Sequence, residues 1–194
     1  MPAAFRAALT AVPGLTVGHW THASGATGCT VVLGPADGMR AACAVRGRAT
    51  GTREIDALHP RHLVPRIDAI LLSGGSAYGL GAADGVMRWL RDRKRGLPVG
   101  PAQVVPIVPT AILFDLPPDG TARWPGPDGG AAACDAAAHE FAEGSVGAGA
   151  GASVGKVLGF DAAMKGGLGT WAVRASDVIV AALVVVNALG DVRD

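Results

Sequence analysis

The chain has 194 residues, enough for one domain with a sizeable core, and 49% of them are hydrophobic. Its 17 basic and 16 acidic residues give a formal net charge of +1, which offers no electrostatic case for nucleic acid or for an anionic membrane. Three scattered cysteines without CxxC spacing argue against a disulfide scaffold, and the N-terminus does not resemble a signal peptide. We therefore expect a single cytoplasmic domain over residues 1–194.

The first half of the chain predicts short strands separated by turns. After a loose arm that ends near Pro13, apolar and β-branched runs predict strands over 15–20, 29–33, 39–45 and 67–72. The Ala-Asp-Gly turn signal at 36–38 would join the second and third of these as a hairpin. The charged, glycine-broken stretch 46–56 is expected to be a loop.

The second half begins with the clearest helix, expected over 77–95, whose apolar residues repeat at helical spacing and whose last turns are basic. Further runs predict strands over 104–108, 112–116 and 171–174, and an alanine-rich helix over 131–142. Paired strands with only two clear helices favour an α+β fold in which helices cover antiparallel sheets.

The run 178–187 (VIVAALVVVN) is apolar at nearly every position and lacks a helical period. This pattern predicts a strand that is buried on both faces. It ends at Asn187, whose carboxamide either caps the turn near Gly190 or serves as a rigidly held hydrogen-bond donor to a substrate carbonyl.

The loop 73–79 (SGGSAYG) precedes the long helix. Its backbone amides would point at whatever sits before the helix N-terminus, which predicts an anion or oxyanion site. Gly74, Gly75 and Ser76 are therefore candidate substrate-binding residues, and Tyr78, the only tyrosine, is a candidate catalytic residue. The alternative is that the glycines only permit a tight turn over which Tyr78 packs.

Other motifs exclude more than they establish. The segment 150–157 departs twice from a phosphate-binding loop, which leaves Lys156 either as an ordinary solvated lysine or as a functional cation. His19 and His22, like His59 and His62, have HxxH spacing without a further ligand, so we predict no metal and no cofactor. No Ser/His/Asp arrangement is evident from the sequence, and the chain offers no convincing nucleophile.

Seven separated motifs, in order, resemble the DmpA-like family of self-processing N-terminal-nucleophile hydrolases. They are VGHW (17–20), GTRE (51–54), SGGSAYGL (73–80), ADGV (83–86), VPIVP (105–109), KGGLG (165–169) and VNA (186–188). The family includes L-aminopeptidase/D-esterases, β-aminopeptidases and nylon-oligomer (6-aminohexanoate-oligomer) endo-hydrolases. The resemblance covers nearly the whole chain.

The resemblance implies that this sequence corresponds to the α chain of a precursor that cuts itself in two. The β chain would then supply an N-terminal Thr or Ser as nucleophile, with its own α-amino group as base. The implied fold is a four-layer α-β-β-α sandwich completed by the β chain, often assembled as (αβ)4. Neither nucleic acid nor membrane is an expected partner.

Residue by residue, Tyr78 and Asn187 match the α-chain residues that stabilise the oxyanion in this family. Lys156 matches a lysine that the nylon-hydrolase branch places near its nucleophile. The aminopeptidase branch has a glutamate two residues before the tyrosine, where it receives the substrate's amino terminus. This sequence has Ser76 at that position, which favours an endo-acting amidase over a strict aminopeptidase.

These features predict an amide hydrolase subunit whose oxyanion hole serves a nucleophile on another chain. Three alternatives stay open at this stage. They are a nylon-oligomer endo-hydrolase, an acyltransferase similar to ornithine acetyltransferases, and a free-standing small-molecule-binding module.

Overall fold

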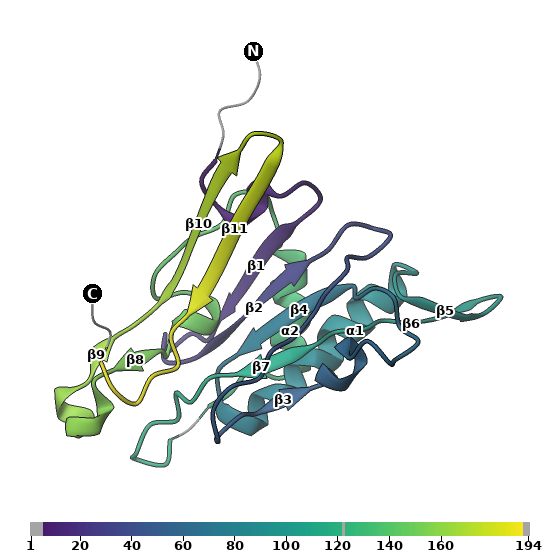
Figure 1. Ribbon diagram of the computed structural model, residues 1–194. Coiled ribbons are helices and arrows are strands. Elements are labelled where there is room, and N and C mark those ends of the chain that lie inside the picture. The colour runs from purple at the N-terminus through teal and green to yellow at the C-terminus, as the bar shows by residue number, and fades with distance from the viewer. Residues whose placement is uncertain (1–5, 122, 192–194) are drawn as a thin grey trace.

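The computed structural model describes residues 6–121 and 123–191 and is organised around one five-stranded sheet (Figure 1). In spatial order the strands are β1 (Thr16–Thr21), β2 (Gly28–Leu33), β4 (Ala69–Ser73), β7 (Thr110–Ile112) and β3 (Thr52–Arg53). Neighbouring strands are antiparallel except for β4 and β7, which run parallel. Every residue of β2 is buried, so this strand lies at the centre of the core.

Two helices cover one face of the sheet: α1 (Ala82–Asp92) and α2 (Pro127–Asp135). The main core lies between this pair and the sheet, and its side chains include Val31, Leu71, Val86, Leu90 and Ala133. Glycines let the two helices approach closely. A Cβ at Gly85 would overlap the carbonyl of Pro127, and one at Gly130 would overlap the carbonyl of Ala82.

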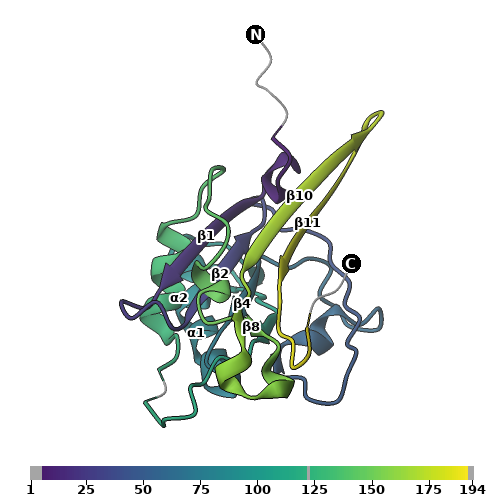
Figure 2. The same cartoon turned by 90° about the vertical axis from the view of Figure 1, so that its left-hand side faces the viewer.

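The opposite face of the sheet carries a short 3-10 turn and the base of a long hairpin. The turn, η4 (Gly147–Gly149), is tied to β2 by a 3.0 Å hydrogen bond from the Ala148 amide to Thr30 Oγ1. The hairpin pairs β10 (Leu168–Ala175) with β11 (Val178–Val185), and its far end projects beyond the rest of the molecule (Figure 2). Along β11, exposed and half-buried residues alternate.

The remaining elements are short. They are η1 (Leu9–Ala11), η2 (Ile55–Leu58), η3 (Ser76–Gly81), β5 (Leu97–Gly100), β6 (Gln103–Val105), β8 (Ser153–Val154), η5 (Lys156–Leu158), η6 (Phe160–Ala162) and β9 (Met164–Lys165). β5 pairs with β6, and β8 pairs with β9.

The structure confirms a mixed α+β fold and most of the predicted elements. The strands expected over 15–20, 29–33, 67–72 and 171–174 are present as β1, β2, β4 and β10. The long helix begins with η3 and continues as α1, which ends at Asp92 rather than Arg95.

Several predictions were wrong. Residues 39–45 do not form a hairpin with β2, because β1 and β4 occupy both edges of that strand, and only Met39 makes a bridge, to Ile67. The second helix lies at 127–135 instead of 131–142, and the strand expected over 112–116 is displaced to β7 at 110–112. The N-terminal arm is not loose from Leu9 onward, because the Leu9 amide donates to Thr170 Oγ1 over 2.8 Å.

The strand predicted over 178–187 exists as β11 but is not buried on both faces. It pairs only with β10, outside the five-stranded sheet. One face of the hairpin exposes Trp171, Val173, Val178, Val180 and Val184, and Trp171 is 67% exposed. In the described residues this apolar face has no covering layer, and the one helical layer lies on the far side of the sheet.

Candidate active site

The loop between β4 and α1 presents Tyr78 to solvent. The chain reverses at Gly75 and Ser76, which have φ values of 82° and 54° and therefore occupy the left-handed region. Tyr78 then stands on η3, 60% exposed, with its ring stacked on Trp124 at a centroid distance of 4.5 Å. The stack fixes the ring and leaves the hydroxyl at the surface.

The backbone amides of Gly74, Gly75 and Ser76 do not point at a free oxyanion site. The amide of Gly74 donates to the carbonyl of Gly28 over 2.9 Å, and that of Ser76 donates to the carbonyl of Leu113 over 2.9 Å. The amide of Gly75 donates to Asp115 Oδ1 over 2.6 Å. All three donors thus bind protein acceptors, which leaves the side chains of Ser76 and Tyr78 as candidate ligand contacts in this loop.

Asn187 follows β11 and is fixed by one hydrogen bond. Its Oδ1 accepts from the backbone amide of Phe114 over 3.0 Å, so the carboxamide does not act as a cap for the turn near Gly190. The Phe114 N–H can only donate, which assigns the oxygen of the carboxamide to that side and the Nδ2 group to the other. Asn187 is exposed, and its side chain presents two N–H donors away from Phe114.

Asp115, the residue after Phe114, is a site residue that sequence reasoning missed. Its Oδ1 accepts the Gly75 amide, while its Oδ2 is buried and, like the buried Thr27 Oγ1, lacks a hydrogen bond of standard geometry. Burial raises the pKa of this carboxyl. The Gly75 amide, the nearby Thr27 hydroxyl and the more distant Lys165 ammonium oppose that shift.

Glycines make room for the Asp115 carboxylate. A Cβ at Gly74 would overlap both Asp115 Oδ2 and Thr27 Oγ1, and a Cβ at Gly151 would overlap Asp115 Oδ2. Gly74 and Gly151 lie on segments that are remote in sequence, so two separate glycine-rich stretches leave space for the same carboxylate. No local pattern around Asp115 signals this role, because its partner Gly75 is 40 residues away.

The segment 113–115 therefore anchors both oxyanion candidates. Leu113 exchanges backbone hydrogen bonds with Ser73 and Ser76, Phe114 holds Asn187, and Asp115 holds Gly75. Three consecutive residues fix the tyrosine loop on one side and the asparagine on the other. The structure connects Tyr78 and Asn187 through this shared support rather than by a hydrogen bond between their side chains.

Lys156 lies on a segment that runs beside the residues after Asn187. The Gly155 amide donates to the Gly190 carbonyl over 2.7 Å, and the Val157 amide donates to the Leu189 carbonyl over 2.9 Å. The Lys156 ammonium donates to the carbonyl of Ser153 and, over 3.2 Å, to Ser153 Oγ. Lys156 is half-buried, and this partial burial lowers its pKa.

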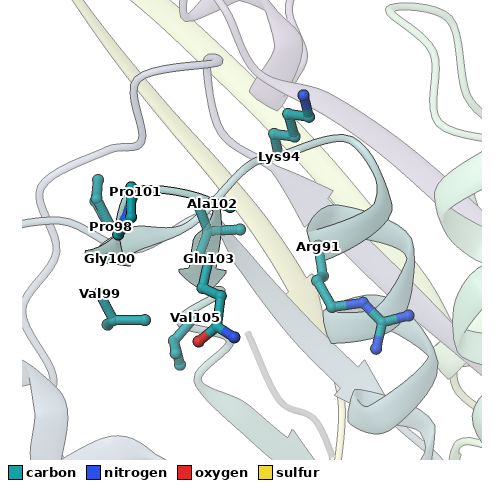
Figure 3. A pocket seen from close by; sticks show the side chains of 10 residues that line it. Arg91, Lys94, Pro98, Val99, Gly100, Pro101, Ala102, Gln103 and Val105 are labelled. Carbon is teal, nitrogen blue, oxygen red and sulfur yellow. The ribbon is translucent and has the colours of Figure 1, made fainter.

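Asn187 also lines a cavity of about 370 Å³. Its other walls come from the loop 43–52 and from Ile55, Ala111 and Ile112. A larger cavity of about 620 Å³ lies between the C-terminal end of α1 and the β5–β6 hairpin, and Arg91, Lys94 and the 98–105 segment line it (Figure 3). None of the predicted site residues lines this second cavity, and Asn187 is the one among them that lines the first.

The described residues hold no group of three or more His, Cys, Asp or Glu that could bind a metal ion. The two ring nitrogens of His19 form hydrogen bonds with Thr30 Oγ1 and with the Ala142 carbonyl. Both nitrogens of this member of the first HxxH pair therefore have protein partners. Burial raises the pKa values of Cys29 and Cys134 to about 12, so neither thiol supplies a thiolate nucleophile at neutral pH. Between residues 6 and 191, position 122 aside, no helix combines the length and apolarity needed to cross a bilayer.

Comparison with known proteins places these features in a family. Residues 7–193 match the model of Peptidase family S58. An uncharacterized aminopeptidase of Mycobacterium tuberculosis is 48% identical over 195 residues, covering 96% of this chain and 54% of the relative. A 6-aminohexanoate-oligomer endohydrolase of Kocuria is 37% identical over 184 residues, covering 94% of this chain and 48% of the relative. The chain thus spans about half the length of these curated relatives.

Among solved structures, a protein of Pyrococcus horikoshii OT3 has the same fold. It superposes with a TM-score of 0.69 at 22% identity, covering 94% of this chain and 56% of the other. The family model spans almost the whole sequence, and the resemblance expected from the seven motifs is confirmed: the chain belongs to Peptidase family S58, the DmpA family.

Proposed function

We propose that this chain is the α part of a self-processed N-terminal-nucleophile amide hydrolase. A β chain from the same precursor would carry the nucleophilic Thr or Ser, and the two chains would complete a four-layer α-β-β-α sandwich that assembles as (αβ)4. The relatives named as an aminopeptidase and as 6-aminohexanoate-oligomer endohydrolases support amide cleavage as the reaction class.

The observation that carries the proposal is the fixed orientation of Asn187. Because Phe114 N–H binds Oδ1, the Nδ2 group is directed away from the protein backbone, at the wall of a cavity. A preorganised donor of this kind stabilises negative charge that develops on a carbonyl oxygen. The Tyr78 hydroxyl, held by the stack on Trp124, would be the second donor.

The proposed reaction is acyl transfer in two steps. The β-chain hydroxyl attacks the substrate carbonyl while its own α-amino group takes the proton, and the oxyanion accepts hydrogen bonds from Asn187 and Tyr78. Collapse of the tetrahedral intermediate expels the amine and leaves an acyl-enzyme. Water then hydrolyses the ester and regenerates the hydroxyl. Lys156 would keep the α-amino group neutral by raising the cost of a second positive charge.

The uncovered apolar face of the β10–β11 hairpin supports a second chain. Trp171, Val173 and Val180 are each at least half exposed on that face, although monomeric proteins seldom leave so many large apolar side chains together in water. A further β layer packed on this face would bury them. The curated relatives have the additional length from which such a layer would come.

Ser76 favours the endo-acting form of the activity. The side chain at this position would meet the substrate's amino terminus, and a serine provides no carboxylate to bind an ammonium group. The relative from Kocuria is named as an endohydrolase, in keeping with this choice.

Intact mass spectrometry of the protein, purified after expression from its complete gene, tests the proposal. We expect two chains under denaturing conditions, the second beginning with Thr or Ser, together with release of amine from an amide substrate. A single chain without amide hydrolysis would contradict the proposal. Transfer of the acyl group to an added amine in preference to water would instead establish the acyltransferase alternative.

A further inference from the structure

The cavity beside Asn187 has an unusual distribution of charge. The described residues that line it include one ionisable cation, Arg46, and no Asp or Glu. The other walls are mainly small and aliphatic, with Val45, Ile55, Ala111 and Ile112 among them. A cavity of about 370 Å³ falls within the size range of small-molecule sites, about 300–1,000 Å³.

Arg46 keeps most of its hydrogen-bonding capacity for a ligand. Its one recorded hydrogen bond is a 3.2 Å contact from a terminal nitrogen to the Val45 carbonyl, and no ion pair to it is found in the described part of the chain. By contrast, Arg53 pairs with Asp84 over 2.7 Å. The nearby Glu54 is also engaged, because its Oε2 accepts the Val108 amide over 2.7 Å.

Asn187 and Arg46 thus lie on the walls of one aliphatic cavity, the first as a carboxamide donor and the second as a planar cation. Guanidinium groups bind carboxylates through paired hydrogen bonds, which gives both affinity and orientation. A ligand that fits this arrangement has an amide at one end, an aliphatic segment in the middle and an anion at the other end.

We propose that this cavity selects amide substrates that carry a carboxylate at the far end of an aliphatic segment, with Arg46 as the residue that binds the carboxylate. The inference rests on the proposed function, since it takes Asn187 as the place where the scissile carbonyl binds. It adds a determinant of specificity to the serine at position 76: beside the scissile amide the site accepts an anionic group in place of an ammonium group.

Binding of small amides to the protein expressed from its complete gene tests this inference. The probes are 6-acetamidohexanoate, with the carboxylate on the amine side of the amide, and 6-(methylamino)-6-oxohexanoate, with the carboxylate on the acyl side. Each is compared by isothermal titration calorimetry with the neutral compound in which a primary carboxamide replaces the carboxylate.

We expect at least one acid to bind about tenfold more tightly than its neutral counterpart, a typical effect of one charge-assisted hydrogen-bonded pair. Arg46→Gln should abolish that preference, and Arg46→Lys should keep part of it. Arg48→Gln is the matched control, because Arg48 belongs to the same exposed loop but does not line the cavity. The preference should also weaken as salt is raised.

Equal binding of acids and neutral amides by the wild type would overturn the inference, as would equal effects of Arg46→Gln and Arg48→Gln. The assay does not depend on turnover. A protein that hydrolyses amides without preferring the acids contradicts only this inference, whereas an Arg46-dependent preference without any hydrolysis supports the carboxylate site and contradicts the proposed function.

Discussion

Asn187 and Phe114 lie 73 residues apart and are joined by one hydrogen bond, in which the Phe114 amide donates to Asn187 Oδ1 over 3.0 Å. The next residue, Asp115, holds the Gly75 amide and with it the loop that carries Tyr78. One short segment after β7 therefore sets the positions of both proposed oxyanion donors. Most of the expected effects of mutation follow from this arrangement.

Asn187→Asp should separate the donor role of Asn187 from its structural role. The carboxylate keeps an acceptor for the Phe114 amide but removes the Nδ2 donors, so the chain should fold while kcat falls by about 100-fold or more. Asn187→Ala should lower kcat to a similar extent. Steady-state hydrolysis of an amide substrate measures both, and near-normal turnover of the Asp variant would remove Asn187 from the mechanism.

Asp115→Ala should destabilise the fold, because it leaves the Gly75 amide without its acceptor and opens a hole among the glycines that surround the carboxylate. The expected loss in the free energy of unfolding is about 1–3 kcal/mol. Asp115→Asn keeps an acceptor for the Gly75 amide, so its free energy of unfolding should fall by less than that of Asp115→Ala. Urea denaturation measures these values. Asp119→Ala is the control, since the Asp119 carboxylate bonds only locally to Thr121 and is exposed; an equal loss at both positions would contradict the role given to Asp115.

The pH dependence of the free energy of unfolding should reflect titration of the Asp115 carboxyl. Burial raises the pKa of Asp115 in the folded state, so the folded chain binds this proton more tightly than the unfolded chain. Stability from this group is therefore greatest at low pH and falls as pH rises from the unfolded pKa through the folded pKa. Asp115→Asn lacks this titration.

The measurement is the difference in the free energy of unfolding between wild type and Asp115→Asn across the acidic range up to neutrality. As pH rises, the free energy of unfolding of Asp115→Asn should increase relative to that of the wild type. A constant difference would show that Asp115 has the same pKa folded and unfolded.

Lys156→Met should change the pH–rate profile as well as the rate. The ammonium lies beside the strand end that carries Asn187, and a positive charge there would lower the pKa of the nucleophile's amine. Its removal should therefore move the acidic limb of the kcat/KM profile to higher pH. Lys94→Met, at the end of α1, is the control and should leave the profile unchanged. A lower rate with an unshifted limb would make Lys156 a structural residue.

Local sequence patterns were enough to find the elements whose partners are near or whose pattern is strong. Alternation identified β1, and apolar periodicity identified α1, because both bury one face against the same core. The run at 178–187 was correctly read as a strand but not as an exposed one. An apolar run indicates that its side chains pack against other apolar residues. It does not indicate whether those residues belong to the described part of the chain.

Long-range relationships were out of reach. The failure at 39–45 arose because its apolar alternation resembles a strand, whereas both edges of β2 are occupied by other segments. The role of Asp115 depends on a residue 40 positions away and on glycines at 74 and 151. In the loop, glycines suggested free amides, yet tertiary contacts engage the amides of Gly74, Gly75 and Ser76. Sequence can propose these residues, but only the fold shows which of their atoms remain available.

The glycines around Asp115 also determine where the protein can be redesigned. Substitutions at Gly74 or Gly151 put a methyl group onto a buried carboxylate oxygen, so saturation libraries at these positions should return almost no folded variants. Arg46 lies on an exposed loop, whereas Ser76 is half-buried and follows the buried residues Gly74 and Gly75. Directed evolution of substrate preference would therefore progress fastest at position 46, while the glycine positions are best left out of any library.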